Sequence, residues 1–227
     1  MGANYSVLAN RVTMDKRLCG LDEVGRGPLA GPLIAAAVVL PSGFVFSDAF
    51  PKLRFDDSKK LNSRQREKAA DAIREVALVL TVEMISVEEI NAQGIGWANR
   101  AVFERLIMRV DAERYTVDGN LKLANLGRKK KRVRCVVRAD ATEQAVSAAS
   151  IIAKVTRDRI MHDLHLDFPQ YGWDHNMGYG TRAHIRALRE HGPCAHHRHQ
   201  FVTTALARSG PKLPGLFTDP FTDEELS

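Results

Sequence analysis

Residues 17–40 read RLCGLDEVGRGPLAGPLIAAAVVL and carry the pattern on which the fold depends. Two apolar runs, at 17–24 and 33–40, enclose the turn-rich segment Gly-Arg-Gly-Pro-Leu-Ala-Gly-Pro. Short apolar runs bounded by Gly and Pro are typical of strands joined by a tight connection. We therefore expect an antiparallel hairpin at the start of the folded chain.

The rest of the chain alternates between helix-like and strand-like patterns. Apolar residues recur at helical spacing over 63–76, 95–110, 142–167 and 182–190, and strand-like runs cover 77–85, 115–118 and 133–138. This alternation predicts an α/β domain, and the opening hairpin makes its sheet mixed. We expect one domain over residues 1–210, with a sheet-and-helix core at about 17–167 and a small helical C-terminal extension at about 168–210. Residues 211–227 are predicted to be a mobile acidic tail.

The charge of the chain is positive and uneven. Its 227 residues hold 33 Lys and Arg against 27 Asp and Glu, and because the tail has one Lys and four carboxylates, the first 210 residues carry +9. A basic body suits a polyanionic partner, although charge alone does not decide this. Three widely spaced cysteines argue against a disulfide framework and fit a reducing cytoplasm, and the longest apolar run, eight residues, is too short to span a membrane.

Four carboxylates stand at the ends of predicted strands. Asp22 and Glu23 close the first strand, Asp118 closes the strand at 115–118, and Asp140 follows the strand at 133–138. Adjacent strand residues point to opposite faces, so Glu23 joins Asp22 in one site only where the strand bends. Carboxylate oxygens suit Mg²⁺ or Mn²⁺, and a cluster of them beside a basic surface suggests phosphodiester hydrolysis with two metal ions. The alternative for Asp118 and Asp140 is a plain role in capping turns.

Six blocks of sequence resemble one known family. They are DEVGRGPLAGP at 22–32, DSKKL at 57–61, VDG at 117–119, AASIIAKVTRD at 148–158, GYGT at 178–181 and HR at 197–198. Their order and spacing are similar to those of ribonuclease HII over about residues 18–201. The resemblance implies a ribonuclease H-like fold and hydrolysis of the RNA strand of RNA/DNA hybrids. It also implies cleavage 5′ of a single ribonucleotide embedded in duplex DNA, leaving a 3′-hydroxyl and a 5′-phosphate. The metal-binding, catalytic carboxylates of the family fall on Asp22, Glu23, Asp118 and Asp140.

Further motifs would read the substrate. The resemblance assigns recognition of the ribose 2′-hydroxyl to Gly25, Arg26 and Gly27, because glycines let the main chain approach a sugar closely; read alone, they form a plain hairpin turn. It assigns packing on the sugar at the RNA–DNA junction to Tyr179, which alone would be a loop anchor. Phosphate contacts are expected from basic side chains of the matching blocks, namely Lys59, Lys60, Lys154, Arg157 and Arg198.

Other clusters leave alternatives open. Residues 119–139 hold eight basic side chains and no acidic one, so this run either binds a nucleic-acid strand or is a solvated loop. A polar stripe on the predicted long helix faces either the site or water; its members are Glu143, Ser147, Ser150, Lys154 and Arg157. A zinc site at Cys194, His196, His197 and His199 is not favoured, since the spacing is too tight for the usual tetrahedral site.

The sequence departs from the family pattern at Ala139, where Gly is common, and at Asn176, Met177 and Gln200, which concern substrate positioning. We expect a cytoplasmic, monomeric endoribonuclease that uses Mg²⁺ or Mn²⁺ on RNA/DNA hybrids or on DNA duplexes containing ribonucleotides, with no membrane association. The alternatives are a ribonuclease HIII-like nuclease that needs a run of ribonucleotides, and an inactive hybrid-binding protein. Residues 215–217 are either a hook for a weak, tail-mediated protein partner or simply part of the tail.

Overall fold

The computed structural model describes residues 17–55 and 61–208 of the chain. Within these ranges five strands form one mixed sheet in the order β3-β2-β1-β4-β5. The strands are β1 (Leu18–Val24), β2 (Leu33–Val39), β3 (Val79–Ile85), β4 (Arg114–Asp118) and β5 (Val133–Val136). β2 pairs antiparallel with both β1 and β3, whereas β4 runs parallel to β1 and to β5. The carboxyl ends of β1, β4 and β5 therefore share one edge of the sheet.

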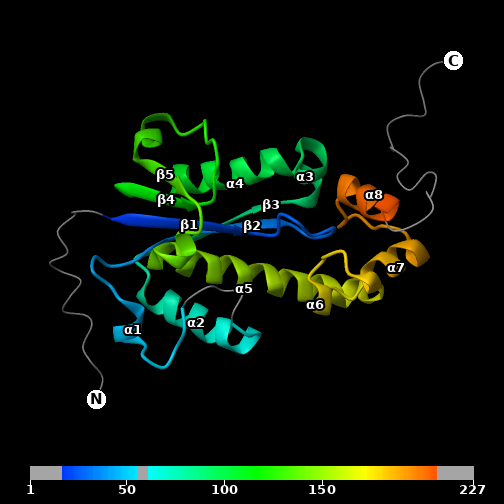
Figure 1. The fold of residues 1–227 in the computed structure, drawn as a ribbon, viewed down its shortest axis with the longest axis horizontal. Helices are drawn as coiled ribbons and strands as arrows, with labels where there is room; N and C mark the ends of the chain where they lie inside the picture. The colour runs from blue at the N-terminus through cyan, green and yellow to red at the C-terminus, as the bar shows by residue number, and fades with distance from the viewer. Residues whose placement is uncertain (1–16, 56–60, 209–227) are drawn as a thin grey trace.

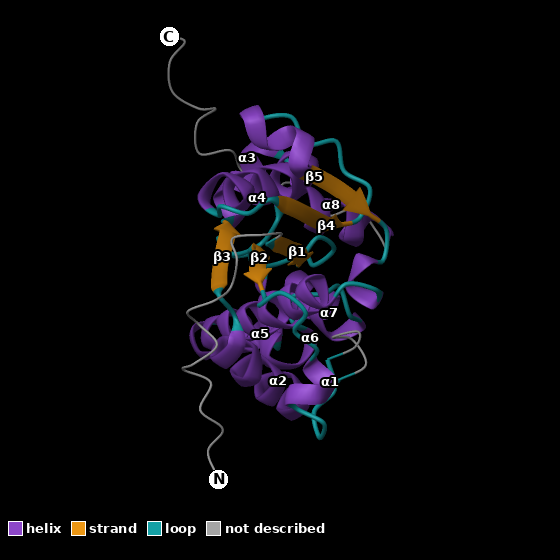
Figure 2. Cartoon of the chain, turned by 90° about the vertical axis from the view of Figure 1, so that its left-hand side faces the viewer, coloured by secondary structure: helices purple, strands orange, loops and turns teal. Residues whose placement is uncertain are grey.

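Helices cover both faces of the sheet. α3 (Val87–Gln93) and α4 (Ile95–Arg109) lie on one face, and α2 (Ser63–Val76) and α5 (Gln144–Asp167) lie on the other (Figures 1 and 2). The short α1 (Phe46–Ala49) lies on the α2 side. α6 (Trp173–Asn176), α7 (Arg182–His191) and α8 (His199–Arg208) gather at one end of the molecule, where a helical extension was expected. The described ranges also contain the 3₁₀ helices η3 (Gly127–Arg132), η4 (Ala139–Ala141) and η5 (Pro169–Tyr171).

The alternation of side chains along β2 builds two apolar layers. Its odd-numbered residues belong to the cluster that includes α4, and its even-numbered residues 34, 36 and 38 belong to the cluster shared with α2 and α5. Every residue of β2 is fully buried, as expected for a strand covered on both faces. A third cluster, which includes Leu29, Met161 and Trp173, packs the extension against α5 and the segment that joins β1 to β2.

β1 approaches α5 closely because residue 20 is glycine. A Cβ at this position would overlap the backbone of Ala145 and Val146 in the first turn of α5. The buried small side chains of Ala148 and Ala149 continue the same contact surface along the helix. The first turns of α5 are thereby seated directly beside β1, near the edge at which the carboxylates stand.

Most of the predicted elements are confirmed. α2 begins after Asn62, whose side chain accepts a hydrogen bond from Gln65 N–H while the Gln65 side chain accepts one from Asn62 N–H. β5 ends two residues earlier than predicted because the chain turns at Arg138, which has a φ of 59°. The sequence patterns missed α1, α3, α6 and α8. Residues 56–60 and the predicted tail lie outside the described residues.

None of the helices in the described ranges combines the length and apolarity needed to cross a membrane.

Candidate active site

Asp22 and Asp118 come together because β1 and β4 are parallel neighbours. Leu21 pairs with Val117, and the next residue of each strand is one of these aspartates. Asp22 pairs with Ala36 on its other side, and Ala36 belongs to the apolar layer shared with α5, so Asp22 points toward that helix. The Asp22 side chain is only 7% exposed and is hydrogen-bonded to the Ser150 side chain of α5.

Glu23 lies beside Asp22 at the end of β1. Its backbone N–H donates to Asp22 Oδ1 at 2.8 Å, and its carboxylate is 3.6 Å from the Arg26 guanidinium. Strand alternation alone would direct Glu23 to the opposite face. Asp118 nevertheless acts on the pKa of both Asp22 and Glu23, so the three carboxylates form one electrostatic group.

Asp118 also fixes the segment that carries Asp140. Ala139 N–H donates to Asp118 Oδ1 at 2.7 Å, which joins the end of β4 to η4. The suggested turn-capping role is therefore real for Asp118, and it places Asp140, the residue after Ala139, near the same edge. Asp140 is half-buried and lines a pocket of about 340 Å³.

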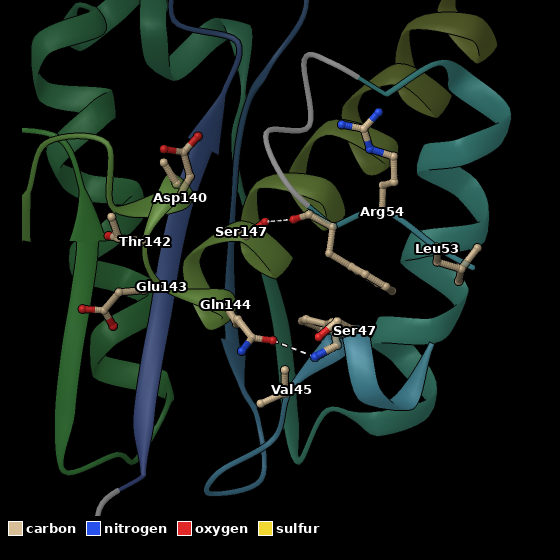
Figure 3. A pocket seen from close by; sticks show the side chains of 12 residues that line it. Val45, Ser47, Leu53, Arg54, Asp140, Thr142, Glu143, Gln144 and Ser147 are labelled. Carbon is tan, nitrogen blue, oxygen red and sulfur yellow. Dashed lines mark hydrogen bonds between the residues drawn. The ribbon is translucent and has the colours of Figure 1, made fainter. Parts of the chain in front are cut away.

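The pocket lies between the start of α5 and the segment around α1 (Figure 3). Gln144 Oε1 accepts from Phe46 N–H at 2.8 Å, and the Ser147 hydroxyl donates to Phe55 O, so two bonds hold its walls together. Asp140 and Arg54 lie on opposite sides of it in Figure 3. No sequence motif singled out Arg54; its place on the pocket wall is known only from the structure.

The electrostatics of the site favour a positive partner for the carboxylates. Burial raises the pKa of Asp22 to about 8, and Glu23 and Asp118 add to the rise. Burial likewise raises the pKa of Glu23 to about 7, although Arg26 opposes this. Grouped carboxylates that resist ionisation are stabilised by a cation, and hard oxygen donors suit Mg²⁺ or Mn²⁺. Across residues 17–55 and 61–208, no three His, Cys, Asp or Glu side chains are arranged so that they could hold a metal ion together.

The Gly-Arg-Gly turn adjoins this edge directly after β1. Gly25 has a φ of 99°, a conformation that favours glycine, and it is buried, whereas Arg26 and Gly27 are exposed. A Cβ on Gly27 would lie 3.7 Å from the Tyr179 ring, which is 44% exposed. The structure thus brings the turn and Tyr179 together across about 150 residues of sequence, next to the carboxylates.

The basic residues of the matching blocks are not equivalent. Lys154 is on α5 and its Nζ donates to Asp158 at 2.6 Å, while Lys59 and Lys60 lie outside the described residues. The expectation that Arg198 and Arg157 contact phosphate is wrong for this structure, because both side chains are 0% exposed and bond to backbone carbonyls. With Ser147 and Ser150 also buried, the polar stripe of α5 faces the protein interior and the site rather than water.

The basic residues between β4 and β5 differ in their contacts. Lys129 donates from Nζ to the carbonyls of Ile107, Met108 and Val110, at the end of α4, and lies 5.8 Å from the Tyr115 ring centroid. It therefore acts as a helix cap rather than as a free surface cation. The neighbouring side chains are exposed, namely Arg128, Lys130, Lys131 and Arg132.

The histidine-rich segment before α8 forms a buried cluster with the extension. His197 is fully buried, its Nδ1 accepts from Cys194 N–H at 3.0 Å, and its Nε2 is 3.1 Å from His184 Nε2. Both ring nitrogens of His197 thus have partners within the protein. His184 in turn contacts Tyr179 O through Nδ1, at 2.9 Å.

Comparison with known proteins agrees with this architecture. A family model described as ribonuclease HII matches residues 19–204. Ribonuclease HII of Burkholderia mallei (strain SAVP1) and that of Burkholderia thailandensis are each 46% identical over 187 residues, covering 82% of this chain and 83% of the relative.

Solved structures share the fold. The ribonuclease HII in the PCNA:RNase HII complex of Archaeoglobus fulgidus aligns with a TM-score of 0.68 and 29% identity, over 81% of this chain and 93% of that one. Ribonuclease H2 of Pyrococcus horikoshii OT3 gives a TM-score of 0.69 at 24% identity, over 85% and 98%. The family model matches nearly the whole described chain, which has a mixed sheet flanked by helices and carboxylates at the parallel edge of that sheet. The chain therefore belongs to the ribonuclease HII family.

Proposed function

We propose that this chain, an endonuclease of the ribonuclease H type by its family, hydrolyses the RNA strand of RNA/DNA hybrids and cuts 5′ of single ribonucleotides in duplex DNA. The products would carry a 3′-hydroxyl and a 5′-phosphate. The proposal rests on one observation: the group formed by the buried Asp22 and the half-buried Glu23 and Asp118 lies beside the Gly-Arg-Gly turn, whose exposed Gly27 packs near Tyr179.

Asp22, Glu23, Asp118 and Asp140 are the residues that would hold two Mg²⁺ or Mn²⁺ ions. The raised pKa values of Asp22 and Glu23 fit this assignment, since bound cations would offset the burial, and the lesser repulsion between carboxylates, that raise them. The related Bst-RNase HIII, 21% identical with a TM-score of 0.61, was solved in complex with Mn²⁺. Bound divalent ions supply Lewis acidity toward the phosphodiester and lower the pKa of water.

The chain's own groups orient the reaction. Ser150 and the N–H of Glu23 hold the Asp22 carboxylate, and the N–H of Ala139 holds Asp118. Gly25, Arg26 and Gly27 present main chain to the 2′-hydroxyl, the group that distinguishes RNA from DNA. Tyr179 offers its ring to the adjacent sugar, and Lys154, half-buried on α5, together with Lys59, would contact phosphates.

The test uses three duplexes of one sequence, containing no ribonucleotide, one ribonucleotide or four in a row, each with Mg²⁺ or Mn²⁺ and with the cut ends mapped. We expect the second and third to be cut, and Asp118→Asn to lower kcat by about 100-fold or more with the fold retained. The control is Asp71→Asn, an exposed carboxylate paired with Arg74 on α2, which should behave as the parent.

Two outcomes would contradict the proposal. Cleavage of the four-ribonucleotide duplex alone would indicate the ribonuclease HIII-like alternative. Binding of all ribonucleotide-containing duplexes without cleavage would indicate an inactive hybrid-binding protein.

Other expectations remain predictions from the sequence: a single catalytic domain, a monomer and a cytoplasmic location. The complex with PCNA belongs to the Archaeoglobus fulgidus protein. For this chain a weak protein partner would be bound through residues 211–227, which lie outside the described residues.

A further inference from the structure

Arg157 of α5 and Arg198, the residue before α8, carry two guanidinium groups that are fully buried. Burial lowers the pKa of Arg157 to about 10 and that of Arg198 to about 9, so both are charged at neutral pH. A buried charge is costly unless it is paired or fully hydrogen-bonded. Within the described ranges neither side chain has an ion pair with a carboxylate, so other groups must compensate both charges.

The compensating groups are backbone carbonyls of the segment between β1 and β2. Arg157 donates from Nε to Pro32 O and from Nη2 to Ala30 O, both at 3.0 Å. Arg198 donates from Nε and Nη2 to Gly31 O, at 3.0 and 2.7 Å, and from Nη1 to Arg26 O at 3.2 Å. The segment therefore wraps around two cations, and its carbonyls point inward.

The same arginine pair connects this segment to the loop of Tyr179. Arg157 donates from Nη1 to Met177 O at 2.9 Å, while Leu29 N–H and Ala30 N–H both donate to Gly178 O. Gly178 has a φ of 81°, and a Cβ there would collide with Ala30 O, so only glycine allows this approach. The turn and the loop are thus one hydrogen-bonded unit centred on Arg157.

The bond to Arg26 O has a directional consequence. In a trans peptide the C=O and the following N–H point in opposite directions. Because Arg198 holds Arg26 O toward the interior, the N–H of Gly27 points away from the interior, on an exposed residue beside the Tyr179 ring. The orientation of this outward donor depends on a side chain that the substrate cannot reach.

We propose that Arg198 and Arg157 are positioning residues for ribonucleotide recognition: the Arg198 guanidinium sets the peptide plane between Arg26 and Gly27, and the Arg157 guanidinium packs against Gly25 and ties the segment that follows to the loop of Tyr179. This inference rests on the proposed function, in which the peptides of residues 25–27 read the 2′-hydroxyl. Lysine cannot replace arginine here, because its one nitrogen does not reach the separate carbonyls that the different nitrogens of each guanidinium group contact.

The experiment compares Arg198→Lys, Arg198→Met and Arg157→Lys with the parent. Lys129→Met is the matched control, since Lys129 also bonds three backbone carbonyls but at the end of α4. Each protein is tested for kcat and KM on a duplex with one ribonucleotide, for the inhibition constant of the same duplex made only of DNA, and for its urea midpoint. The parent's cleavage of the first duplex separately tests the proposed function.

For the Arg198 and Arg157 variants we expect kcat/KM on the ribonucleotide duplex to fall about 10- to 100-fold, as for a site that loses a specific polar contact. The inhibition constant of the all-DNA duplex should stay within about twofold, because phosphate contacts dominate non-specific binding. Lys129→Met should lose stability but keep the parent's kcat/KM on the ribonucleotide duplex and its inhibition constant for the all-DNA duplex. If Arg198→Met does not fold, the two lysine variants decide. The inference is overturned if the parent cleaves the ribonucleotide duplex but the Arg198 and Arg157 variants keep the parent's preference for that duplex over the all-DNA duplex. It is also overturned if Lys129→Met loses this preference to the same extent.

Discussion

The buried pair His184 and His197 makes the stability of this fold dependent on pH. Tyr179 O can only accept, so the His184 proton lies on Nδ1 and its Nε2 is an acceptor, which also receives a hydrogen bond from Trp173 Nε1 at 3.2 Å. Cys194 N–H donates to His197 Nδ1, so the His197 proton lies on Nε2 and points to His184. This assignment follows from the partners, and an additional proton on His197 Nδ1 would face the Cys194 N–H, with only the weak acceptor Cys194 Sγ nearby, at 3.3 Å.

The size of the effect follows from the pKa of His197. Burial, and then the nearby His184, lower this pKa from 6.5 to about 3. Between pH 6.5 and about pH 3 the unfolded chain therefore binds more protons than the folded one. The stability that comes with a neutral His197 is complete above pH 6.5 and is lost as the pH falls. From pH 7 to pH 5 the loss from His197 alone is about 2 kcal/mol. The pKa of His184 is lowered in the same direction, which adds to the loss.

The assay is urea unfolding of the parent and of His197→Asn at pH 7 and pH 5. Asp22 and Glu23 also titrate on unfolding, but they do so in both proteins, and the difference between the proteins cancels them. We expect the parent to be the more stable at pH 7, with its advantage reduced by about 2 kcal/mol at pH 5. An advantage of equal size at the two pH values would refute the assignment of a neutral, buried His197.

Three further predictions concern the site and its support. Asp22→Asn should unfold at a higher temperature than the parent at pH 7.5 without added metal. Burial raises the pKa of the Asp22 carboxyl to about 8, so ionisation of this group in the unfolded chain destabilises the parent fold as the pH rises above 3.8. Mg²⁺ should stabilise the parent but not the variant. Lys129→Met should cost about 1.5–3 kcal/mol in urea unfolding, because the carbonyls at the end of α4 lose a charged donor. Gly20→Ala should lower the thermal midpoint and slow cleavage, since the new methyl group overlaps the backbone of α5 and must displace it, at a cost of about 1–3 kcal/mol.

Local signals in the sequence were sufficient for the sheet and for α2, α4, α5 and α7. The hairpin follows from two apolar runs around a Gly- and Pro-rich turn, and α2 follows from its Asn62 cap. α3 carried the same kind of signal, because Ser86 and Glu89 form a capping box. A helix of seven residues, however, is too short for its apolar residues to show a helical period in the sequence. α8 was missed because it begins in a polar, histidine-rich stretch and is held by contacts with the rest of the extension.

The roles of the basic residues could not be predicted from sequence, because charge predicts exposure only on average. The carbonyls that bind Arg157 and Arg198 are up to 127 and 172 residues away in the chain, respectively. No local pattern encodes such pairing. Three of the carboxylates behaved differently: Asp22, Glu23 and Asp118 stand at strand ends, and parallel pairing brings those ends to one edge whatever the distance along the chain.

α5 connects the two halves of the site, which are the carboxylate edge on one side and the Gly-Arg-Gly turn with the Tyr179 loop on the other. The spacing of two residues along this helix sets the distance between the halves. Ser150 reaches Asp22 at the carboxylate edge, and Arg157 reaches the turn and the Tyr179 loop. Seven residues separate them, which is about two helical turns, so both side chains point from the same side of the helix about 10 Å apart. A helix seated against Gly20 thus fixes the distance between the groups that would hold metal and those that would read the sugar. A change that shifts α5 along β1 would displace both halves, whereas Arg157→Lys would disturb only the second; this difference separates loss of catalysis from loss of ribonucleotide discrimination.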